Sequence, residues 1–426
     1  MGHSRKLIFA ILTCCLPLFL ATSAFAQEKA PDSSASAADE TPAPAQRTEV
    51  DSRTQYPAFL RDSYFGVHLS YLSYNFTDKN LAPAFQSSYV AVPHLAARVD
   101  LLGHHFNQYV SLQASYMRPV AYVTYHNVNG DNELHHVWMN FGALLLQGQA
   151  PMSDRLSAYG EGGWGIVSRR GFDSDAGVPV VKNAHYGAVV LGGGLIYHAS
   201  PQWDLMTGVT YIPRREADNQ PASAFASAGF RYNMLPPKTE SAHVSSGDDS
   251  GYIFPENLVQ LEFGTGAGYK VNTFFSDTAH VFWGGNVLIG PGVALHYDRN
   301  VYHTRKVFAL DLGTSISYWK SHVEHQGFAT VSAYPLLRFT LVRTKPADYF
   351  VMYSFAGPTY ISRVIIDSLG TGGHWTFQDF MGAGAFFGKE RKASFAIKIS
   401  HYSNGNLFID NAALKVPVTL SFGYAF

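Results

Sequence analysis

The chain ends on residues 416–426, VPVTLSFGYAF, in which apolar residues alternate with small or polar ones. Successive side chains of a β-strand point to opposite faces. One face of this stretch would carry Val416, Val418, Leu420, Phe422, Tyr424 and Phe426, and the other Pro417, Thr419, Ser421, Gly423 and Ala425. The stretch therefore predicts a strand with one apolar face and one face of small or polar side chains.

The same alternation recurs earlier in the chain, in runs of about ten residues, the length of a strand that crosses a membrane. In residues 307–319, Phe308, Leu310, Leu312, Ile316 and Tyr318 share the apolar face, and Asp311 lies on the other. Residues 331–341, 109–116 and 223–232 follow the same rule. An apolar outer face and a polar inner face are typical of a membrane-spanning β-barrel.

Such runs number about eight in each half of the chain, and eight strands are the smallest number that closes a membrane barrel. They begin near Tyr64, Val90, Tyr109, Val137, Leu156, Tyr186, Trp203 and Ala224, and near Leu258, Val287, Val307, Val331, Val351, Trp375, Phe395 and Val416. The predicted fold class is all-β, with two eight-stranded antiparallel transmembrane β-barrels in series.

Two other architectures share the alternation. A pair of soluble β-sandwiches explains neither the 14% aromatic content nor the final strand, which stops on an aromatic residue and resembles the recognition signature of outer-membrane barrel proteins. A single barrel of about sixteen strands would need the polar stretch 236–256 as one of its periplasmic turns, which are short. We therefore expect a first barrel at 57–235, a polar linker at 236–256 and a second barrel at 257–426.

The first residues predict export. Arg5 and Lys6 precede a largely apolar stretch, and Ala24-Phe25-Ala26 supplies small residues for cleavage, so residues 1–26 are interpreted as a signal peptide. Lipidation at Cys14 is the alternative. Both cysteines, Cys14 and Cys15, would leave with the signal peptide, which excludes disulfides and thiol chemistry in the mature chain. Residues 27–56 are rich in Ala, Pro and Ser and are expected to form a disordered lead-in.

Composition excludes several function classes. With 31 Lys and Arg against 32 Asp and Glu, the chain has no basic surplus, and no nucleic-acid partner is expected. Beyond the N-terminus no apolar run has the roughly 18 residues of a spanning helix. The 18 histidines are scattered, and pairs such as His104-His105 lack metal-ligand spacing on one element, so neither a metal nor another cofactor is predicted.

Residues 395–406 combine the alternation with reactive side chains. His401 and Ser403 fall on the apolar, lipid-facing side of the predicted strand, with Cα atoms ~6.5 to 7 Å apart. That spacing allows a histidine to activate a serine nucleophile. The strand is the seventh of its barrel and so ends at the extracellular rim, where a polar pair facing lipid is costly unless it has a function. A structural alternative is a polar strand end that reaches the membrane interface.

The run from His401 to Asn406, followed by one closing strand, resembles the PagL-type lipid A 3-O-deacylases, also called acyloxyacyl hydrolases. The resemblance implies a metal-independent serine esterase on the outer wall of the barrel, with lipid A, or lipopolysaccharide, of the outer leaflet as its substrate. It implies Ser403 as nucleophile, His401 as general base, and Asn404 and Gly405 at the oxyanion hole. The first half resembles the small OmpA-like outer-membrane barrels in general.

One position departs from the family pattern. The resemblance places a carboxylate that orients the histidine about twelve residues after the serine, where this chain has Lys415. Asp410, the nearest carboxylate in the following loop, is the first candidate for the acid, and Asp379 on the neighbouring strand is the second. A non-catalytic outer-membrane barrel, an adhesin or a structural protein, is the alternative function. The sequence gives no indication of the oligomeric state.

Overall fold

The structure is a computed structural model that describes residues 52–234 and 253–426, with the exception of 280, 305 and 409. The predicted signal peptide, the lead-in up to residue 51 and the linker from 236 to 252 lie outside the described residues. Within the described part, no helix is both long and apolar enough to cross a membrane. The described chain forms two closed antiparallel barrels of eight strands each, which confirms the predicted fold class.

The first barrel closes in the order β6-β4-β3-β1-β12-β11-β10-β7, with β7 pairing back onto β6. Short strands β2 and β5 extend the sheet from β6, and β8 and β9 form a separate hairpin. The strands are β1 (Ser63–Tyr74), β2 (Tyr89–Ala91), β3 (Leu95–His105), β4 (Val110–Pro119), β5 (Val123–His126), β6 (Leu134–Pro151), β7 (Leu156–Arg170), β8 (Phe172–Asp173), β9 (Pro179–Val181), β10 (Ala184–His198), β11 (Trp203–Ile212) and β12 (Ser223–Met234). Short 3₁₀ turns are η1 (Ser52–Thr54), η2 (Ala58–Leu60), η3 (Asp78–Asn80), η4 (Val128–Gly130) and η5 (Glu216–Asp218).

The second barrel closes in the order β13-β14-β15-β16-β17-β20-β21-β22, with β22 pairing onto β13. Its strands are β13 (Asn257–Thr265), β14 (Val287–His303), β15 (Phe308–Ser321), β16 (Gly327–Arg343), β17 (Ala347–Ile361), β20 (Trp375–Phe387), β21 (Ala393–Ser403) and β22 (Leu414–Ala425). A small hairpin, β18 (Ile365–Ile366) and β19 (Leu369–Gly370), lies between β17 and β20, and α2 (Tyr269–Thr273) and the π-helical turn η7 (Phe274–Thr278) follow β13.

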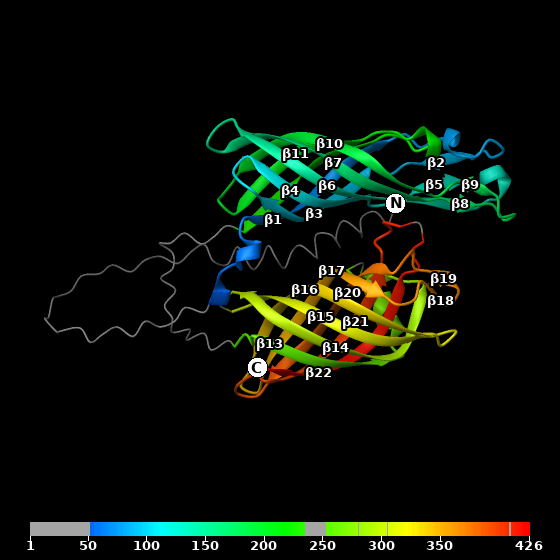
Figure 1. Ribbon diagram of the computed structural model, residues 1–426. Helices are drawn as coiled ribbons and strands as arrows, with labels where there is room; N and C mark the ends of the chain where they lie inside the picture. Colours follow the sequence, from blue (N-terminus) through cyan, green and yellow to red (C-terminus); the bar gives the residue numbers. More distant parts are fainter. Residues whose placement is uncertain (1–51, 235–252, 280, 305, 409) are drawn as a thin grey trace, which may run out of the picture.

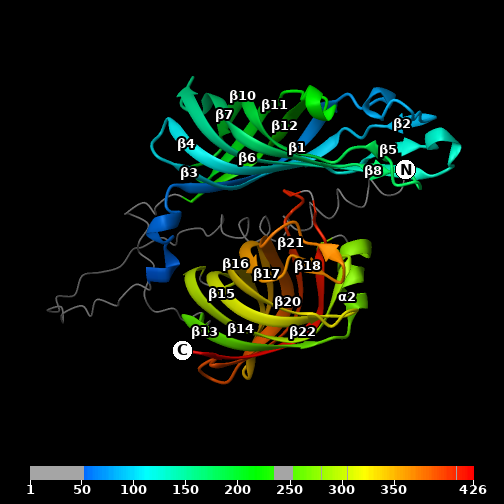
Figure 2. The same cartoon turned by 45° about the vertical axis from the view of Figure 1, so that its right-hand side comes forward.

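Each barrel has one end with short connections and one with long connections, here named the turn end and the loop end. The turn-end connections span 106–109, 152–155 and 199–202 in the first barrel, and 304–307, 344–346 and 388–392 in the second. The barrels lie side by side with their loop ends on the same side, where β8 and β9 of the first and β18 and β19 of the second are found (Figures 1 and 2). Both barrels can therefore cross one membrane in the same orientation.

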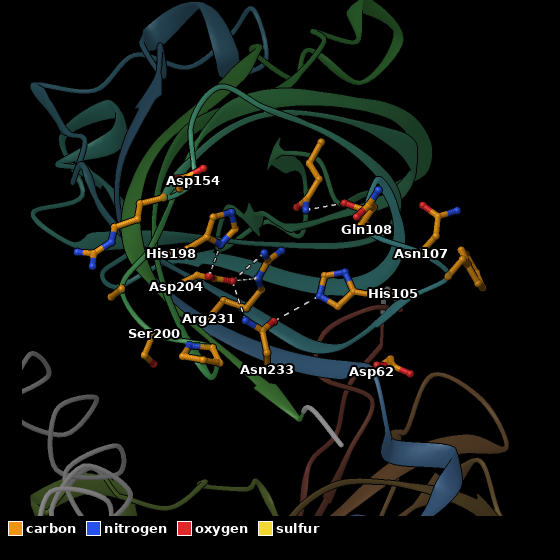
Figure 3. A pocket seen from close by; sticks show the side chains of 15 residues that line it. Asp62, His105, Asn107, Gln108, Asp154, His198, Ser200, Asp204, Arg231 and Asn233 are labelled. Carbon is orange, nitrogen blue, oxygen red and sulfur yellow. Dashed lines mark hydrogen bonds and ion pairs between the residues drawn. The ribbon is translucent and has the colours of Figure 1, made fainter. Parts of the chain in front are cut away.

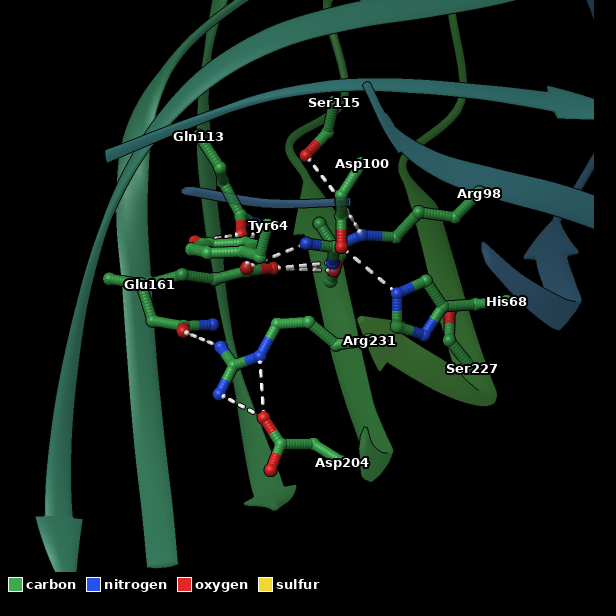
Figure 4. Close-up of polar contacts among 12 residues, drawn as sticks. Tyr64, His68, Arg98, Asp100, Gln113, Ser115, Glu161, Asp204, Ser227 and Arg231 are labelled. Atoms are coloured by element: carbon green, nitrogen blue, oxygen red, sulfur yellow. Dashed lines mark hydrogen bonds and ion pairs between the residues drawn. The ribbon is translucent and has the colours of Figure 1, made fainter. Parts of the chain in front are cut away.

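Polar side chains fill the lumen of both barrels. In the first, Arg98 binds Glu161 through two nitrogens, at 2.7 and 2.8 Å, and Asp100 through Nε at 3.0 Å (Figure 4). In the second, Glu262 lies 3.0 Å from both Lys398 and His296. The expected inward direction of Asp311 is confirmed by its ion pair with Arg338, at 3.0 Å. The outer walls carry exposed apolar residues such as Leu144, Trp164, Leu191, Leu295, Ile316 and Phe422.

One strand differs from the sequence expectation. The run near Val90 forms only the short strand β2, and the second strand of the barrel is β3, which begins at Leu95. Strand β3 alternates as far as Asp100, with Leu95, Ala97 and Val99 on one face and the inward Arg98 and Asp100 on the other; a register shift against β4 between Asp100 and Leu102 then breaks the pattern. Fifteen of the sixteen expected runs fall on the barrel strands, and the bulge in β3 shortens the alternation that would have marked the remaining strand.

The second barrel has a distinctive seam at its loop end. Beyond the end of β13, strands β14 and β22 meet in parallel, with Val287 opposite Leu414. The connection 266–286 is thereby excluded from the wall, and α2 packs against β22 (Figure 2). Asn272 fixes this connection, because its Nδ2 donates to the carbonyl oxygen of Val416 at 2.8 Å. This excluded segment covers the site described next.

Candidate active site

His401 and Ser403 lie on the outer wall of the second barrel, near the loop end of β21, as the alternation predicts. Their neighbours point into the lumen: Lys398 binds Glu262, and the hydroxyl of Tyr402 accepts a hydrogen bond from Gln378 Nε2 at 3.1 Å. The alternate residues 401 and 403 therefore face outward. His401 is nonetheless only 4% exposed, while Ser403 is half-buried.

Strand register surrounds His401 with two charged residues. Asp379 of β20 lies directly opposite it on one side, and Lys415 of β22 lies opposite on the other. The distance between His401 Nδ1 and Asp379 Oδ2 is 3.2 Å, and both side chains are nearly inaccessible to solvent. An acceptor on Nδ1 leaves the proton on that nitrogen and makes Nε2 the free, basic one.

Asp379 is itself held by a distortion of the neighbouring strand. Its Oδ1 accepts a hydrogen bond from the backbone N–H of Ala356 at 2.7 Å. Ala356 has φ +51°, in the left-handed region, and sits where the register of β17 against β20 shifts between Ser354 and Gly357. Left-handed backbone costs a residue with a Cβ roughly 1 to 2 kcal/mol. The bulge therefore holds Ala356 in an unfavourable backbone conformation that directs its N–H group at the Asp379 carboxylate. Strained backbone of this kind is typical of functional sites.

Asp410, the first sequence candidate for the acid, does not occupy this position. Its side chain is exposed, and its carboxylate lies beside Gly370 of β19, where an added Cβ would come within 3.3 Å of Oδ2. Its carbonyl oxygen accepts a hydrogen bond from Asn404 Nδ2. The structure therefore brings the second candidate, Asp379, to His401, because a residue directly across two paired strands is closer than one in the loop.

Asn404 anchors the loop between β21 and β22. Its Nδ2 donates to the carbonyl oxygens of Thr371, at 3.0 Å, and Asp410, at 2.6 Å, and its backbone N–H donates to Asn411 Oδ1. All its N–H groups are thus engaged, so in this conformation Asn404 has no donor left for an oxyanion. The crowding is tight, since a Cβ on Gly372 would lie 2.1 Å from the carbonyl oxygen of Asp410.

Gly405 follows Asn404 in the loop and lies beside the Ser403 hydroxyl. Its backbone N–H points at Ser403 Oγ with a long N to O distance of 3.4 Å. Its φ is +63°, a conformation in which glycine is free of the Cβ penalty. Among the described residues, Ser403 Oγ has no hydrogen bond to His401 Nε2 in this conformation. The histidine ring instead packs edge-on against Phe282 of the excluded segment, with ring centroids 6.4 Å apart.

The turn end of the first barrel contains a cavity of about 720 Å³. Strands β3, β10, β11 and β12 point side chains into it, namely His105, His198, Asp204, Arg231 and Asn233 (Figure 3). The cavity ends at the polar network of the lumen, where Arg231 binds Asp204 and packs over the ring of Tyr64 (Figure 4). In the described part of this barrel, side chains therefore fill the lumen, and a polar cavity lies at its turn end.

A Ser-His-Asp chain of contacts lies at this cavity and was missed from the sequence. Ser157 Oγ is 3.0 Å from His198 Nε2, and His198 Nδ1 is 2.7 Å from Asp204 Oδ1. The three residues come from β7, β10 and β11, so only the barrel register brings them together. Ser157 is 2% exposed and does not line the cavity. A substrate cannot reach this serine, so it does not act as a nucleophile. The three hydrogen-bonded residues are a structural part of the lumen network.

No cluster of three or more His, Cys, Asp or Glu side chains that could hold a metal ion occurs among the described residues.

Comparison with known proteins bears on this barrel directly. Residues 289–424 match the family model described as lipid A 3-O-deacylase (PagL). The match spans β14 to β22 and includes Asp379, His401 and Ser403, and it confirms the resemblance of the second half to the PagL family. No curated protein matches the chain.

Several solved structures are similar to parts of the chain. The outer membrane enzyme PagL is 17% identical, with 40% of this chain and 99% of that chain covered and a TM-score of 0.29. Neisserial surface protein A is 15% identical, with 40% and 97% covered and a TM-score of 0.28. The N-terminal β-barrel domain of Pseudomonas aeruginosa OprF is 14% identical, with 40% and 97% covered and a TM-score of 0.25.

Proposed function

We propose that the second barrel is an outer-membrane serine esterase that removes the ester-linked acyl chain at the 3-position of lipid A. The observation that carries the proposal is a row of three side chains on one face of the wall. Asp379 lies opposite His401, and Ser403 lies two residues after His401 on the same strand. The row stands on the outer wall of a barrel that matches the PagL family model. The mechanism needs no metal.

Each residue of the row has one task in this mechanism. Ser403 Oγ attacks the ester carbonyl carbon while His401 Nε2 takes the hydroxyl proton, and Asp379 holds Nδ1–H and stabilises the imidazolium that forms. The N–H of Gly405 donates to the oxyanion of the tetrahedral intermediate. The imidazolium then protonates the departing sugar oxygen. Water, activated by the same nitrogen, cleaves the acyl-enzyme and releases the fatty acid.

The first step needs a rotation of the Ser403 side chain from its contact with Gly405 to His401. Residues two apart on one strand face are within reach of such a contact. Catalytic hydrogen bonds are often long before substrate binds. The half-buried position of Ser403 leaves the hydroxyl accessible at the wall, while Phe282 covers the histidine and limits the access of water.

The membrane position of the site fits this substrate. Outer-membrane barrels place short turns in the periplasm and long loops outside. The row lies toward the loop end, which corresponds to the outer leaflet, where lipopolysaccharide is found. Polar side chains on a lipid-facing wall are costly, so their presence at this level indicates a function. Export by the proposed signal peptide 1–26 and residence in the outer membrane belong to the same proposal.

The test is mass spectrometry of lipid A from cells that express the wild-type chain or the Ser403→Ala variant. We expect the wild type to remove one acyl chain and the variant to remove none. Ser400→Ala is the matched control, because Ser400 lies in the same strand but faces the lumen, and it should leave deacylation unchanged. Heat-modifiable electrophoretic mobility reports whether each variant folds. Intact lipid A in cells with folded wild-type protein would favour the non-catalytic barrel.

A further inference from the structure

The first barrel carries a polar row on its outer wall near the loop end. Asn140 of β6 pairs directly with Ser168 of β7, and Ser168 pairs directly with His185 of β10. Tyr116 of β4 lies diagonally next to Asn140, and its hydroxyl is 2.7 Å from Asn140 Oδ1. The strand alternation places all four outside the barrel, on a wall whose other exposed side chains are largely apolar.

The loop between β21 and β22 of the second barrel covers this row. Ser168 Oγ donates to the carbonyl oxygen of Leu407 at 3.1 Å, and Tyr116 OH donates to the carbonyl oxygen of Gly405, also at 3.1 Å. The ring of Phe408 packs against His185, with centroids 5.8 Å apart. Figures 1 and 2 both show this loop, in red, extending from the second barrel toward the first.

Burial confirms that the contact is close. Asn140 is 3% exposed and Ser168 is 6% exposed, although both point away from their own lumen. A Cβ on Gly142, which also faces outward, would lie 3.0 Å from Leu407 Cδ2. Glycine at this position therefore lets the loop approach the wall.

The available hydroxyl protons link the polar row of the first barrel to the β21–β22 loop. The single phenolic proton of Tyr116 serves one acceptor at a time, so the cluster is satisfied when Asn140 presents its NH₂ group and the phenol donates to Gly405. Ser168 can accept from His185 Nδ1, 2.9 Å away, and donate to Leu407. Away from the loop, the hydroxyls of Tyr116 and Ser168 would lose these two carbonyl acceptors and keep only Asn140 and His185 as partners on a wall that faces lipid.

We propose that the first barrel is a positioning platform for the active-site loop of the second, an inference that rests on the proposed esterase function. Gly405 contributes the N–H that faces Ser403, and a glycine at φ +63° has little intrinsic preference for that conformation. Tyr116 holds the carbonyl on the other side of the same residue. With the carbonyl of Leu407, two residues further on, also held by Ser168, the direction of the Gly405 N–H is fixed before substrate binds.

A second attachment keeps the barrels side by side at their turn ends. Tyr56 stacks on Tyr302 of the second barrel, with ring centroids 4.5 Å apart, and its hydroxyl is 2.8 Å from that of Tyr232 in the first. Arg53 donates to the carbonyl oxygen of Phe254 at 3.0 Å. Contacts at both ends restrict the angle between the barrels, so the polar row remains opposite the loop.

The kinetic test uses the full-length double variant Tyr116→Phe with Ser168→Ala. Because displacement of a catalytic group by about 1 Å can cost up to a hundredfold in rate, we expect kcat for lipid A deacylation to fall roughly 10- to 100-fold, with a smaller change in KM. Tyr211→Phe is the matched control, since Tyr211 is an exposed tyrosine on the outer wall of β11, and it should leave kcat unchanged. An active wild type whose double variant keeps full kcat would overturn the platform role.

Cross-linking tests the docking without any enzymatic readout. Paired substitutions Gly142→Cys and Leu407→Cys should form a disulfide on mild oxidation, seen as a reductant-sensitive mobility shift of the denatured chain. The only native cysteines, Cys14 and Cys15, lie in the proposed signal peptide. Val209→Cys paired with Leu407→Cys is the control and should not cross-link, because Val209 is exposed on β11. Failure of the first pair would refute the docking, whereas cross-linking in a chain that leaves lipid A intact would refute only the esterase function.

Discussion

Replacement of Asp379 by asparagine tests the proposed catalytic row most directly, because it changes one atom and leaves the shape of the side chain intact. The backbone N–H of Ala356 requires an acceptor, so the amide oxygen should take the place of Oδ1. The NH₂ group then faces His401 Nδ1, which can accept this hydrogen bond only when it carries no proton. The imidazole proton moves to Nε2, and the nitrogen that must receive the serine proton is already protonated.

The size of the effect follows from the geometry. In a serine protease, the equivalent change of tautomer lowers kcat about 10⁴-fold. The 3.2 Å contact here is longer than the roughly 2.7–2.9 Å typical of a charge-assisted hydrogen bond, so part of that effect will be lost. We expect Asp379→Asn to lower kcat by roughly 10²- to 10⁴-fold, equivalent to about 3 to 5 kcal/mol of transition-state stabilisation.

The assay is the initial rate of fatty acid release from purified lipid A by protein refolded in detergent, with heat-modifiable mobility as the folding control. Asp410→Asn is the matched variant, because Asp410 is an exposed carboxylate of the adjacent loop. It should change kcat by less than about threefold, as expected for a surface substitution. The reasoning is refuted if Asp379→Asn retains wild-type kcat, or if Asp410→Asn causes the larger loss. Retention by both variants would indicate a serine-histidine dyad.

Three further substitutions probe the surroundings. Gly372→Ala places a Cβ against the carbonyl oxygen of Asp410, and we expect it to displace the loop, lower kcat and raise the proteolytic sensitivity of residues 404–413. Lys415→Ala removes a cation that bonds Thr273 Oγ1 at 3.4 Å and offers no acceptor to His401, so kcat measured in the same assay should change by less than about tenfold. Glu161→Gln leaves Arg98 without one of its two buried carboxylate partners, and urea titration in detergent should show the first barrel destabilised by about 3 to 5 kcal/mol with the deacylation rate little changed.

Sequence alone predicts the architecture well because alternation is a local property. The parity of residues 395–403 is enough to place His401 and Ser403 on the outer wall, and the strand count places them near the loop end. The strand at Leu95 is less visible, since a register shift between Asp100 and Leu102 cuts its alternating run short. A bulge changes which face the following side chains occupy, and the sequence alone does not mark it.

The identity of the carboxylate beside His401 depends on strand pairing between distant parts of the chain. The sequence therefore leaves the choice between Asp410 and Asp379 open. Asp379 reaches the histidine only because the register of β20 against β21 places the two residues opposite one another. Asp410 is closer in sequence, but the hydrogen bonds of Asn404 direct the loop toward Thr371 and away from the histidine. The Ser157, His198 and Asp204 contacts were missed for the same reason, and a pairing map of the strands would have revealed both sets.

Separate closure of the two rings sets the width of each lumen. Closing a single ring would require a loop roughly twice as long, and doubling a loop costs only about 0.6 kcal/mol, so chain entropy does not select two rings over one. Ring size instead sets the lumen: eight strands leave room for side chains, whereas sixteen enclose an aqueous channel. Arg98 and Glu161, and Lys398 and Glu262, bridge their narrow lumens directly. The described strands equal a porin's in number, but divided into two rings they form lumens narrow enough for single side chains to bridge.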